Sequence, residues 1–594
     1  MAARETSGIP DPGLRRQAAW LLAAAALLVA ACGTGEDVAG AAADTTPPTI
    51  QATSPAASAS AVATTAAITV TFSEAINTAT LTGASFTVSA AGVPVAGSVS
   101  ASGRTASFAP AAPLAGATAH SATVSAAVKD LAGNPLAAAH SWTFVTAAIA
   151  GARAWSTPVL LETSDNPASE PAIAATTEDL PTSATQATAV WAQHDGAQFS
   201  IYANRYRDGA WQGAELVERL TATGVGRSAG GAYSPRVAMG AFGRAVISWG
   251  YDDGNANYSI WGNVYDGLFS ADNARQLGFG GNASDHQTSF DSSGHDVFNV
   301  WTQYEPSRVP AAYRIFQRQF LFVPCEFNVG CVWDRNDFGW RSTTLIETAA
   351  FDSISPQVSG YGSGGAVSVW GKSQGVFSIE LWANVHAKAT GWATPVRVNT
   401  GSGIAQQQAV AAAADGSAIA SWIESVAGRP TLFASRLGSA GWSAPVTFDD
   451  SRAGQVSAPQ LVVDAAGNTL IVWVQLAGSV QTLYSRRCPP GPLTACSAPT
   501  AVPGLAGRSD EGPRMAGAPN GDAIVVTRQV DAAGIPSIMA SHFSASVGWG
   551  AAAALVDSDG VGAQIAMDKS GRATAVWSKI DPGGRFSIYA SRFR

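Results

Sequence analysis

The chain has 594 residues, a formal net charge of -8 at pH 7 and only 13% charged residues. The acidic balance excludes the basic footprint of a nucleic-acid-binding protein, and the length allows several domains with sizeable cores. Although 46% of the residues are hydrophobic, only one segment could enter a bilayer, which excludes a polytopic membrane protein.

The first segment of the chain has the organisation of an export signal. Arg15 and Arg16 precede an apolar run over residues 18–30, and small residues follow. A basic start, a short apolar stretch and a small-residue cleavage site are typical of a signal peptide, which we place at residues 1–31. The apolar run is too short to remain in a membrane as a spanning helix.

The residues around Cys32 indicate how the exported chain is held. The order Val29-Ala30-Ala31-Cys32 resembles the lipobox of bacterial lipoproteins. The resemblance implies cleavage before Cys32, lipidation of its thiol and attachment to the membrane through the lipid alone. No Asp follows Cys32, and by resemblance this favours the outer membrane of the cell envelope. The alternative is an ordinary secretory signal with a chance cysteine. Residues 32–44 are small and lack apolar periodicity, so they predict a flexible tether.

Residues 45–147 alternate short β-like runs with turns. About 100 residues with some seven short strands predict a β-sandwich. The segments 44–49, 68–74, 108–110, 130–136 and 141–144 also resemble, in this order, the bacterial Ig-like domains of surface proteins. The resemblance implies a spacer domain. Asp130 and Asn134 would suit calcium, but a turn explains the same residues.

The rest of the chain, residues 150–594, is an internal repeat. An apolar, small, Trp element recurs every 50 to 69 residues, followed by a Ser-Ile strand and then a Trp-led strand. The eight copies, of which only one lacks the Trp, are 188–191, 246–249, 298–301, 367–370, 419–422, 470–473, 524–527 and 574–577. Four strands in about 50 residues predict a propeller blade.

The two ends of the repeat region indicate how the ring closes. The region begins with a lone fourth strand led by Trp155 and ends on a third strand over residues 588–593. A last blade that takes its fourth strand from the chain start leaves no exposed edge. We therefore predict an all-β chain: an Ig-like β-sandwich followed by an eight-bladed β-propeller, with seven blades as the alternative. This propeller resembles those of secreted bacterial lipoproteins whose function is unassigned.

Four cysteines remain once Cys32 is lipidated. They are close in sequence two by two, Cys325 with Cys331 and Cys488 with Cys496. Local disulfides are the simplest pairing in an oxidising compartment. The alternative is a four-cysteine zinc site, whose pairs ordinarily enclose two to four residues, whereas these enclose five and seven.

The loops that join fourth strands to the next first strands are long and open on one face, around the central channel. The candidate ligand rim on this mouth consists of Asp285, Asp352, Asp449, Asp510 and Asp557. Such a rim would hold calcium or a cationic ligand, or would be a solvated edge; otherwise we expect no cofactor. On the opposite face the insertion 321–339 carries a candidate binding loop with Phe327, Trp333 and Phe338, or these aromatic residues pack over a blade edge.

The sequence contains only weak matches to catalytic motifs. Residues 226–230 spell Gly-x-Ser-x-Gly and residues 360–365 spell Gly-x-Gly-x-x-Gly, but neither lies at a strand-to-helix turn. The main hypothesis is a monomeric cell-envelope lipoprotein whose Ig-like spacer presents a propeller that binds a glycan or an extracellular protein. The alternative hypothesis is an enzyme, a glycoside hydrolase or polysaccharide lyase acting in the channel, and the weak motifs favour the non-enzymatic one.

Overall fold

The computed structural model describes residues 43–594 with gaps at 65, 91–92, 112–113, 115–117, 147–153, 177–184, 219–230, 256, 268, 270–273, 279–281, 308–309, 323–338, 348–350, 376–377, 450–453, 478–479, 508, 510, 532–533 and 551–553. The chain separates into two compact units, Met1–Ala150 and Gly151–Arg594. Among the described residues, no helix is long and apolar enough to cross a membrane.

The first unit is a sandwich of two sheets whose inward side chains form one core. In β3, Ile68, Val70 and Phe72 are buried and alternate with half-buried Thr residues, the period-2 pattern of a strand with one face on a core. One sheet contains β1 (Ile50–Ser54), β3 (Ile68–Phe72), β7 (Thr105–Pro110) and β6 (Gly97–Ser102). The other contains β2 (Ala59–Val62), β9 (His140–Thr146), β8 (Ala119–Val124), β4 (Phe86–Ala90) and β5 (Val93–Pro94), and η1 (Thr78–Thr80) lies between β3 and β4.

The second unit is a propeller. Its described residues form eight antiparallel sheets, numbered here from the chain start, and in the first seven of them the strands run outward in chain order. The first four sheets contain, in turn: β11 (Ala168–Ala175), β12 (Ala187–His194), β13 (Phe199–Arg207), β14 (Ala210–Trp211) and β15 (Glu215–Leu216); β16 (Gly231–Met239), η2 (Ala241–Gly243), β17 (Ala245–Asp252), β18 (Tyr258–Tyr265) and β19 (Arg275–Gln276); β20 (Ala283–Phe290), β21 (Asp296–Glu305), β22 (Ala312–Leu321), β23 (Gly339–Trp340) and β24 (Thr344–Leu345); β25 (Ser353–Tyr361), β26 (Gly365–Ser373), β27 (Ile379–Ala387), β28 (Gly391–Trp392) and β29 (Val396–Arg397).

The remaining four sheets follow the same plan. They contain, in turn: β30 (Gln406–Ala412), β31 (Ala418–Val426), β32 (Arg429–Gly438), β33 (Gly441–Trp442) and β34 (Val446–Thr447); β35 (Val456–Val463), β36 (Thr469–Ala477), β37 (Val480–Cys488), η4 (Leu493–Ala495) and β38 (Thr500–Gly507); β39 (Arg514–Gly517), β40 (Ala523–Val530), β41 (Pro536–Ser544), β42 (Gly548–Trp549) and β43 (Ala554–Ser558); β44 (Gly560–Met567), β45 (Ala573–Ile580), β46 (Phe586–Phe593) and β10 (Val159–Leu160).

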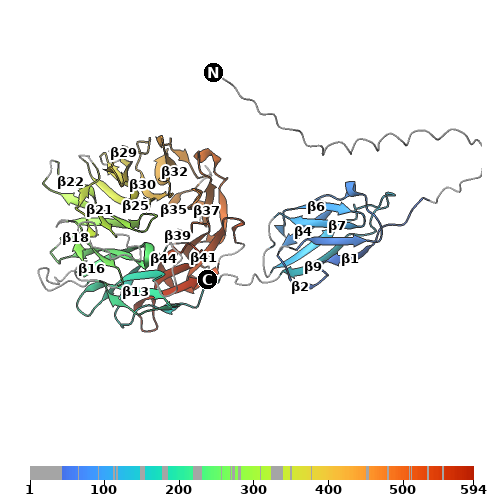
Figure 1. The fold of residues 1–594 in the computed structure, drawn as a ribbon, viewed down its shortest axis with the longest axis horizontal. Coiled ribbons are helices and arrows are strands. Elements are labelled where there is room, and N and C mark those ends of the chain that lie inside the picture. Colours follow the sequence, from blue (N-terminus) through green and yellow to red (C-terminus); the bar gives the residue numbers. More distant parts are fainter. Residues whose placement is uncertain are drawn as a thin grey trace, which may run out of the picture. The chain divides into compact units, whose positions relative to one another are not determined.

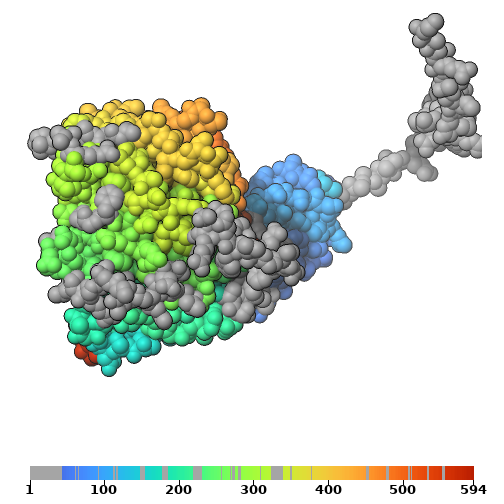
Figure 2. Space-filling view, turned by 60° about the vertical axis from the view of Figure 1, so that its left-hand side comes forward, coloured from blue at the N-terminus to red at the C-terminus, as the bar shows by residue number. Residues whose placement is uncertain are grey.

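The sheets form a closed ring (Figure 1). The first strand of each sheet contacts the first strand of the next, and β44 of sheet 8 contacts β11 of sheet 1. As predicted, the outer strand of sheet 8 comes from the start of the unit: Val159 pairs with Ala590, and Leu160 with Tyr589. In Figure 2 the red end of the chain accordingly lies beside the cyan segment that begins the ring. The pairing covers the edge that the last sheet would otherwise expose.

The repeated Trp lies at the centre of each second strand. Seven of these indoles are less than 2% exposed, and each packs against the preceding sheet; they are Trp191, Trp249, Trp301, Trp370, Trp422, Trp473 and Trp577. In several sheets the indole N–H is hydrogen-bonded to the side chain two residues on, as from Trp191 to Gln193 and from Trp301 to Gln303, both at 3.0 Å. Burial of large aromatic side chains between sheets is the main apolar contribution to the ring.

Candidate functional site

The innermost strands carry a repeated irregularity. Seven of the eight have a bulge near their first residues, where two residues face one on the second strand. The bulged residue has a positive φ, and it is followed by proline in sheets 1, 2, 4 and 6. Proline is tolerated there because it has no N–H to pair. These residues are Glu170, Ser234, Asp285, Ser355, Gln407, Ala458 and Gly562, with φ of 54°, 49°, 50°, 51°, 52°, 50° and 66°.

Pairing resumes after each bulge at a position that we call the ring position, the residue paired with the one just before the repeated Trp. Six of the eight ring positions carry an amide or a guanidinium group; the eight, in order, are Ala172, Arg236, Gln287, Gln357, Ala409, Gln460, Arg514 and Gln564. Arg236, Gln460 and Arg514 each donate to the carbonyl of the preceding proline, at 3.1, 2.9 and 3.2 Å. Guanidinium and amide groups keep further N–H donors for a ligand.

A cavity of about 520 Å³, the central cavity, opens at this level. Residues from the four consecutive sheets 7, 8, 1 and 2 line it, so it lies at the inner strands of one half of the ring. Its polar lining includes Glu170, Arg236, Glu511 and Gln564. Glu170 accepts the N–H of Ser234 in the next sheet, and Glu511 accepts the N–H of Gly562 at 2.8 Å. The two carboxylates thus connect neighbouring sheets while facing the cavity.

Two arginines converge on this cavity. Burial lowers the pKa of Arg236, the Arg514 guanidinium lowers it further, and the carboxylates of Glu170 and Asp285 oppose the shift. Burial likewise lowers the pKa of Arg514, against the effect of Glu511. Within the described residues neither guanidinium makes an ion pair, although Glu170 and Asp285 lie near Arg236 and Glu511 lies near Arg514. Charged groups that lie close together without being paired leave hydrogen-bonding capacity for a ligand in the cavity.

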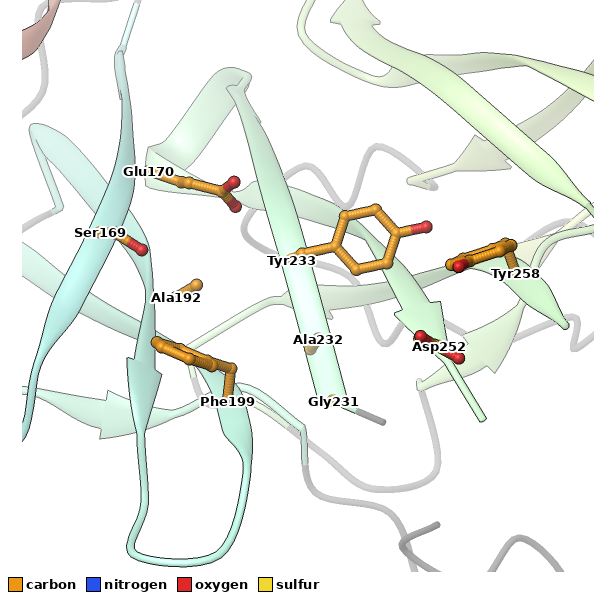
Figure 3. A pocket seen from close by; sticks show the side chains of 9 residues that line it. All are labelled: Ser169, Glu170, Ala192, Phe199, Gly231, Ala232, Tyr233, Asp252 and Tyr258. Atoms are coloured by element: carbon orange, nitrogen blue, oxygen red, sulfur yellow. The ribbon is translucent and has the colours of Figure 1, made fainter. Parts of the chain in front are cut away.

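A second cavity, of about 350 Å³, lies between sheets 1 and 2 and shares Ser169 and Glu170 with the central cavity; we call it the side cavity. Its aromatic lining is Phe199, Tyr233 and Tyr258. Figure 3 shows the Tyr233 ring pointing toward Tyr258, and the centroids of the two rings lie 6.3 Å apart in an edge-to-face arrangement.

The absence of a side chain at Gly250 allows the Tyr233 ring to take this position. A Cβ at Gly250 would lie 2.5 Å from the Tyr233 ring, so the ring packs directly on the bare backbone of β17. Burial, followed by the neighbouring Asp252, Tyr258 and Glu170, raises the pKa of Tyr233 to about 12. The Tyr233 hydroxyl therefore remains protonated at neutral pH and can donate a hydrogen bond, but it is a poor general base.

The predicted rim carboxylates do not gather at the central cavity. Asp285 is exposed at the bulge of β20, and Asp352 is exposed and accepts the N–H of Tyr313 at 2.9 Å. Asp449 is buried, accepts the N–H of Leu432 at 3.1 Å and pairs with Arg429. Asp557 accepts the indole N–H of Trp577 and the ammonium of Lys579, both at 2.9 Å. None of these four lines the central cavity, and Asp510 lies outside the described residues.

The one buried member of this set, Asp449, has a structural explanation. The second residue after the end of the outermost strand repeatedly turns back to accept a backbone N–H from the third strand of its own sheet. These acceptors are Glu218 to Ile201, Glu347 to Ile315, Asn399 to Leu381 and Asp449 to Leu432. A polar residue is needed at this position because the N–H it meets is buried.

Two further groups of predicted residues have different outcomes. Cys488 and Cys496 form the predicted disulfide. Cys325, Cys331 and the aromatic residues Phe327, Trp333 and Phe338 lie outside the described residues, as does Cys32.

Metal ligands are sparse in the part of the chain that the structure describes. One group of three carboxylates has oxygens within 4.8 Å of one another: Asp44, Glu74 and Asp130, in the first unit. Asp130 already accepts the N–H groups of Gly133 and Asn134, at 2.6 and 2.8 Å, which form the predicted turn. The described part of the propeller mouth contains no comparable group.

Sequence reasoning missed the ring position and the aromatic lining. A signal for the first was present, because the pairs Ser234-Pro235, Ser355-Pro356 and Ala458-Pro459 are each followed by Arg or Gln. For the second, the signal was an aromatic residue directly before the Ser-Ile strand, as in Phe199, Tyr258 and Phe586.

The comparison with known families identifies the first unit. Residues 44–146 match the model of the bacterial Ig-like domain. They form such a domain. This agrees with the predicted resemblance over residues 45–146, while no curated protein sequence matches the chain.

Several solved structures share similarity with the chain at low scores. A polysaccharide lyase described as an ulvan lyase is 12% identical, with a TM-score of 0.39 over 62% of this chain and 93% of its own. An endo-arabinase from Bacteroides thetaiotaomicron is 13% identical, with a TM-score of 0.27 over 57% of this chain and 98% of its own. A protein of unknown function from Dyadobacter fermentans is 10% identical, with a TM-score of 0.34 over 52% and 94%. At these scores, function has to be argued from the site.

Proposed function

We propose that this protein binds a glycan in the central cavity of its propeller, as a cell-envelope lipoprotein anchored through Cys32. The observation that carries the glycan proposal is the composition of the cavity lining. Carboxylate acceptors (Glu170, Glu511) alternate with guanidinium and amide donors (Arg236, Gln564), and the aromatic ring of Phe586 lies at the border. A sugar presents hydroxyl groups that both donate and accept, beside apolar C–H faces, so it uses all three kinds of group.

The lipoprotein part of the proposal rests on the sequence around Cys32 and on the domain order. A lipid anchor, a tether over residues 32–44 and an Ig-like domain would hold a binding domain away from a membrane surface. The disulfide between Cys488 and Cys496 supports an exported protein, because such bonds persist in oxidising compartments.

Glycan cleavage is the second candidate, because Glu170 and Glu511 line one cavity and glycosidases use two carboxyl groups. Both carboxylates are, however, already hydrogen-bonded to the backbone of the next sheet. The Tyr233 hydroxyl, with its pKa raised to about 12, is poorly suited to abstract a proton in a lyase reaction at neutral pH. Binding without turnover is therefore the better-supported function.

A glycan array probed with the purified full-length protein tests the proposal. We expect binding to at least one class of glycan, and loss of about 10- to 100-fold in affinity in Arg236→Gln, the range for one charge-assisted hydrogen bond. Arg104→Gln, on the Ig-like domain, is the matched control. Binding that Arg236→Gln leaves unchanged would contradict the site, an array without hits would contradict the function, and release of shorter products would establish the enzyme instead.

A further inference from the structure

One position at the start of the third strand, beside the turn that follows the second strand, pairs in every sheet with the residue three after the position of the repeated Trp. The residue there is aromatic in four consecutive sheets, namely Phe586 in sheet 8, Phe199 in sheet 1, Tyr258 in sheet 2 and Tyr313 in sheet 3. Sheets 4 to 7 carry Ile379, Pro430, Gln481 and Pro536 at this position, none of them aromatic. Phe586, Phe199 and Tyr258 are 43%, 38% and 39% exposed, so a large part of each of these rings remains accessible, whereas Tyr313 is half-buried against Tyr304. The ring of sheets thus has one aromatic sector.

Both cavities described above lie in this sector. Phe586 lines the central cavity, whereas Phe199 and Tyr258 line the side cavity. The two cavities adjoin at Ser169 and Glu170, which line both. The two cavities therefore form one elongated surface. Aromatic side chains are distributed along it, and polar side chains, including Glu170 and Arg236, lie between them.

The opposite side of the ring provides an internal comparison. A cavity of about 350 Å³ lies between sheets 4 and 5, where Ile379 stands in place of Phe199 and Gln406 in place of Tyr233. The fold alone therefore produces a cavity of this size between neighbouring sheets. The aromatic residues are an addition made in one sector, and their presence there is not required to build a sheet.

Repeated aromatic surfaces separated by polar groups fit a chain of sugar rings better than one ring. Each pyranose or furanose ring offers an apolar face to an aromatic side chain, and its hydroxyl groups reach the polar side chains beside it. A terminal sugar would fill the central cavity and leave Phe199 and Tyr258 without a partner. A polymer segment would cover both cavities.

We propose that the ligand is an extended segment of a polysaccharide, bound along sheets 8, 1 and 2 over Phe586, Phe199 and Tyr258. This inference rests on the proposed glycan-binding function of the same mouth and adds that binding is to an internal stretch of polymer at one asymmetric site.

The test is the dependence of affinity on chain length. Calorimetry of the full-length protein would use three oligosaccharide series of one to eight residues: cello-oligosaccharides, arabino-oligosaccharides and oligogalacturonates. We expect at least one series to gain tenfold or more in affinity between one and four residues and then to level off, at one site per protein. A single sugar that binds as tightly as the longer members of its series would overturn the inference while leaving glycan binding intact. If no series binds and the glycan array also gives no hits, both this inference and the proposed glycan-binding function are overturned.

Variants locate the site. Phe199→Ala, Tyr258→Ala and Phe586→Ala should each lower affinity for the longest oligosaccharide about three- to tenfold, the range of one aromatic contact. Phe199→Ala and Tyr258→Ala should lower the affinity for the single sugar less than they lower the affinity for the longest oligosaccharide. Ile379→Ala, at the equivalent position of sheet 4, is the control and should bind like the unmodified protein. Unchanged length dependence in the aromatic variants, or tighter binding of an unstructured peptide at the same groove, would contradict the assignment. The thermal unfolding temperature of each variant checks that folding is retained.

Discussion

Glu347 provides a prediction about stability that can be worked from the structure. It follows β24 in sheet 3, its side chain is buried, and its two carboxylate oxygens accept from the N–H of Ile315 and the hydroxyl of Ser353. Burial raises its pKa from 4.5 to about 7, against the effects of Ser353, Arg314 and Lys372. The folded protein therefore holds a proton on Glu347 that the unfolded chain has already lost above about pH 4.5.

The sign of the effect follows from this difference. Because the folded state binds more protons between the two pKa values, the contribution of Glu347 to the free energy of unfolding is fully present below pH 4.5 and is lost as pH rises through 7. At about 1.4 kcal/mol per pKa unit, the loss approaches about 3 kcal/mol above pH 7. Glu347→Gln removes it, because an amide does not titrate. The equivalent residue of sheet 4, Asn399, already uses an amide to accept the N–H of Leu381 at 3.0 Å.

Urea unfolding of the full-length protein, followed by tryptophan fluorescence at several pH values from 4.5 to 8, measures the effect. We expect Glu347→Gln to become more stable relative to the unmodified protein as pH rises, by a total of about 3 kcal/mol. Asp208→Asn, on an exposed turn, is the control. Parallel pH profiles for Glu347→Gln and the unmodified protein would refute the reasoning, as would a variant that loses relative stability toward pH 8.

Three more predictions follow from the fold and the sequence. Trp422→Ala should cost about 3–5 kcal/mol in urea unfolding, because the indole is fully buried against sheet 4 and stacks on Phe433 at 5.8 Å; a cost below about 1 kcal/mol would contradict this packing role. Replacing Cys488 and Cys496 together by Ser should lower stability by about 2 kcal/mol, and an unfolding curve that does not differ between oxidised and reduced unmodified protein would argue against the bond. Cys32→Ala should move the protein from the membrane to the soluble fraction after fractionation; retention on membranes would contradict the lipid anchor.

The architecture was predictable because its signals are periodic. The repeated Trp marks the buried second strand, and the unmatched strands at the two ends of the repeat predict the pairing of Val159–Leu160 with Ala590 and Tyr589. The Ig-like domain was predictable from motifs spread over its whole length.

The site was less predictable, for physical reasons. A bulge adds one residue to a strand, so the alternation that ordinarily separates inward from outward side chains no longer shows that Arg236 lines the channel. Carboxylates in loops suggested a ligand rim, but Asp449 meets an unsatisfied N–H of its own sheet and turns inward. An aromatic residue such as Phe199 at a strand start is typical of any strand, and only the register across sheets shows that it belongs to one sector.

The most direct test of glycan binding at the propeller mouth is a structure of the protein with a bound oligosaccharide chosen from the array. The account predicts sugar rings against Phe199 and Phe586, with hydroxyl groups within hydrogen-bonding distance of Glu170 and Arg236. Sugar bound on the opposite face of the ring, or on the Ig-like domain with both cavities free of ligand, would contradict it.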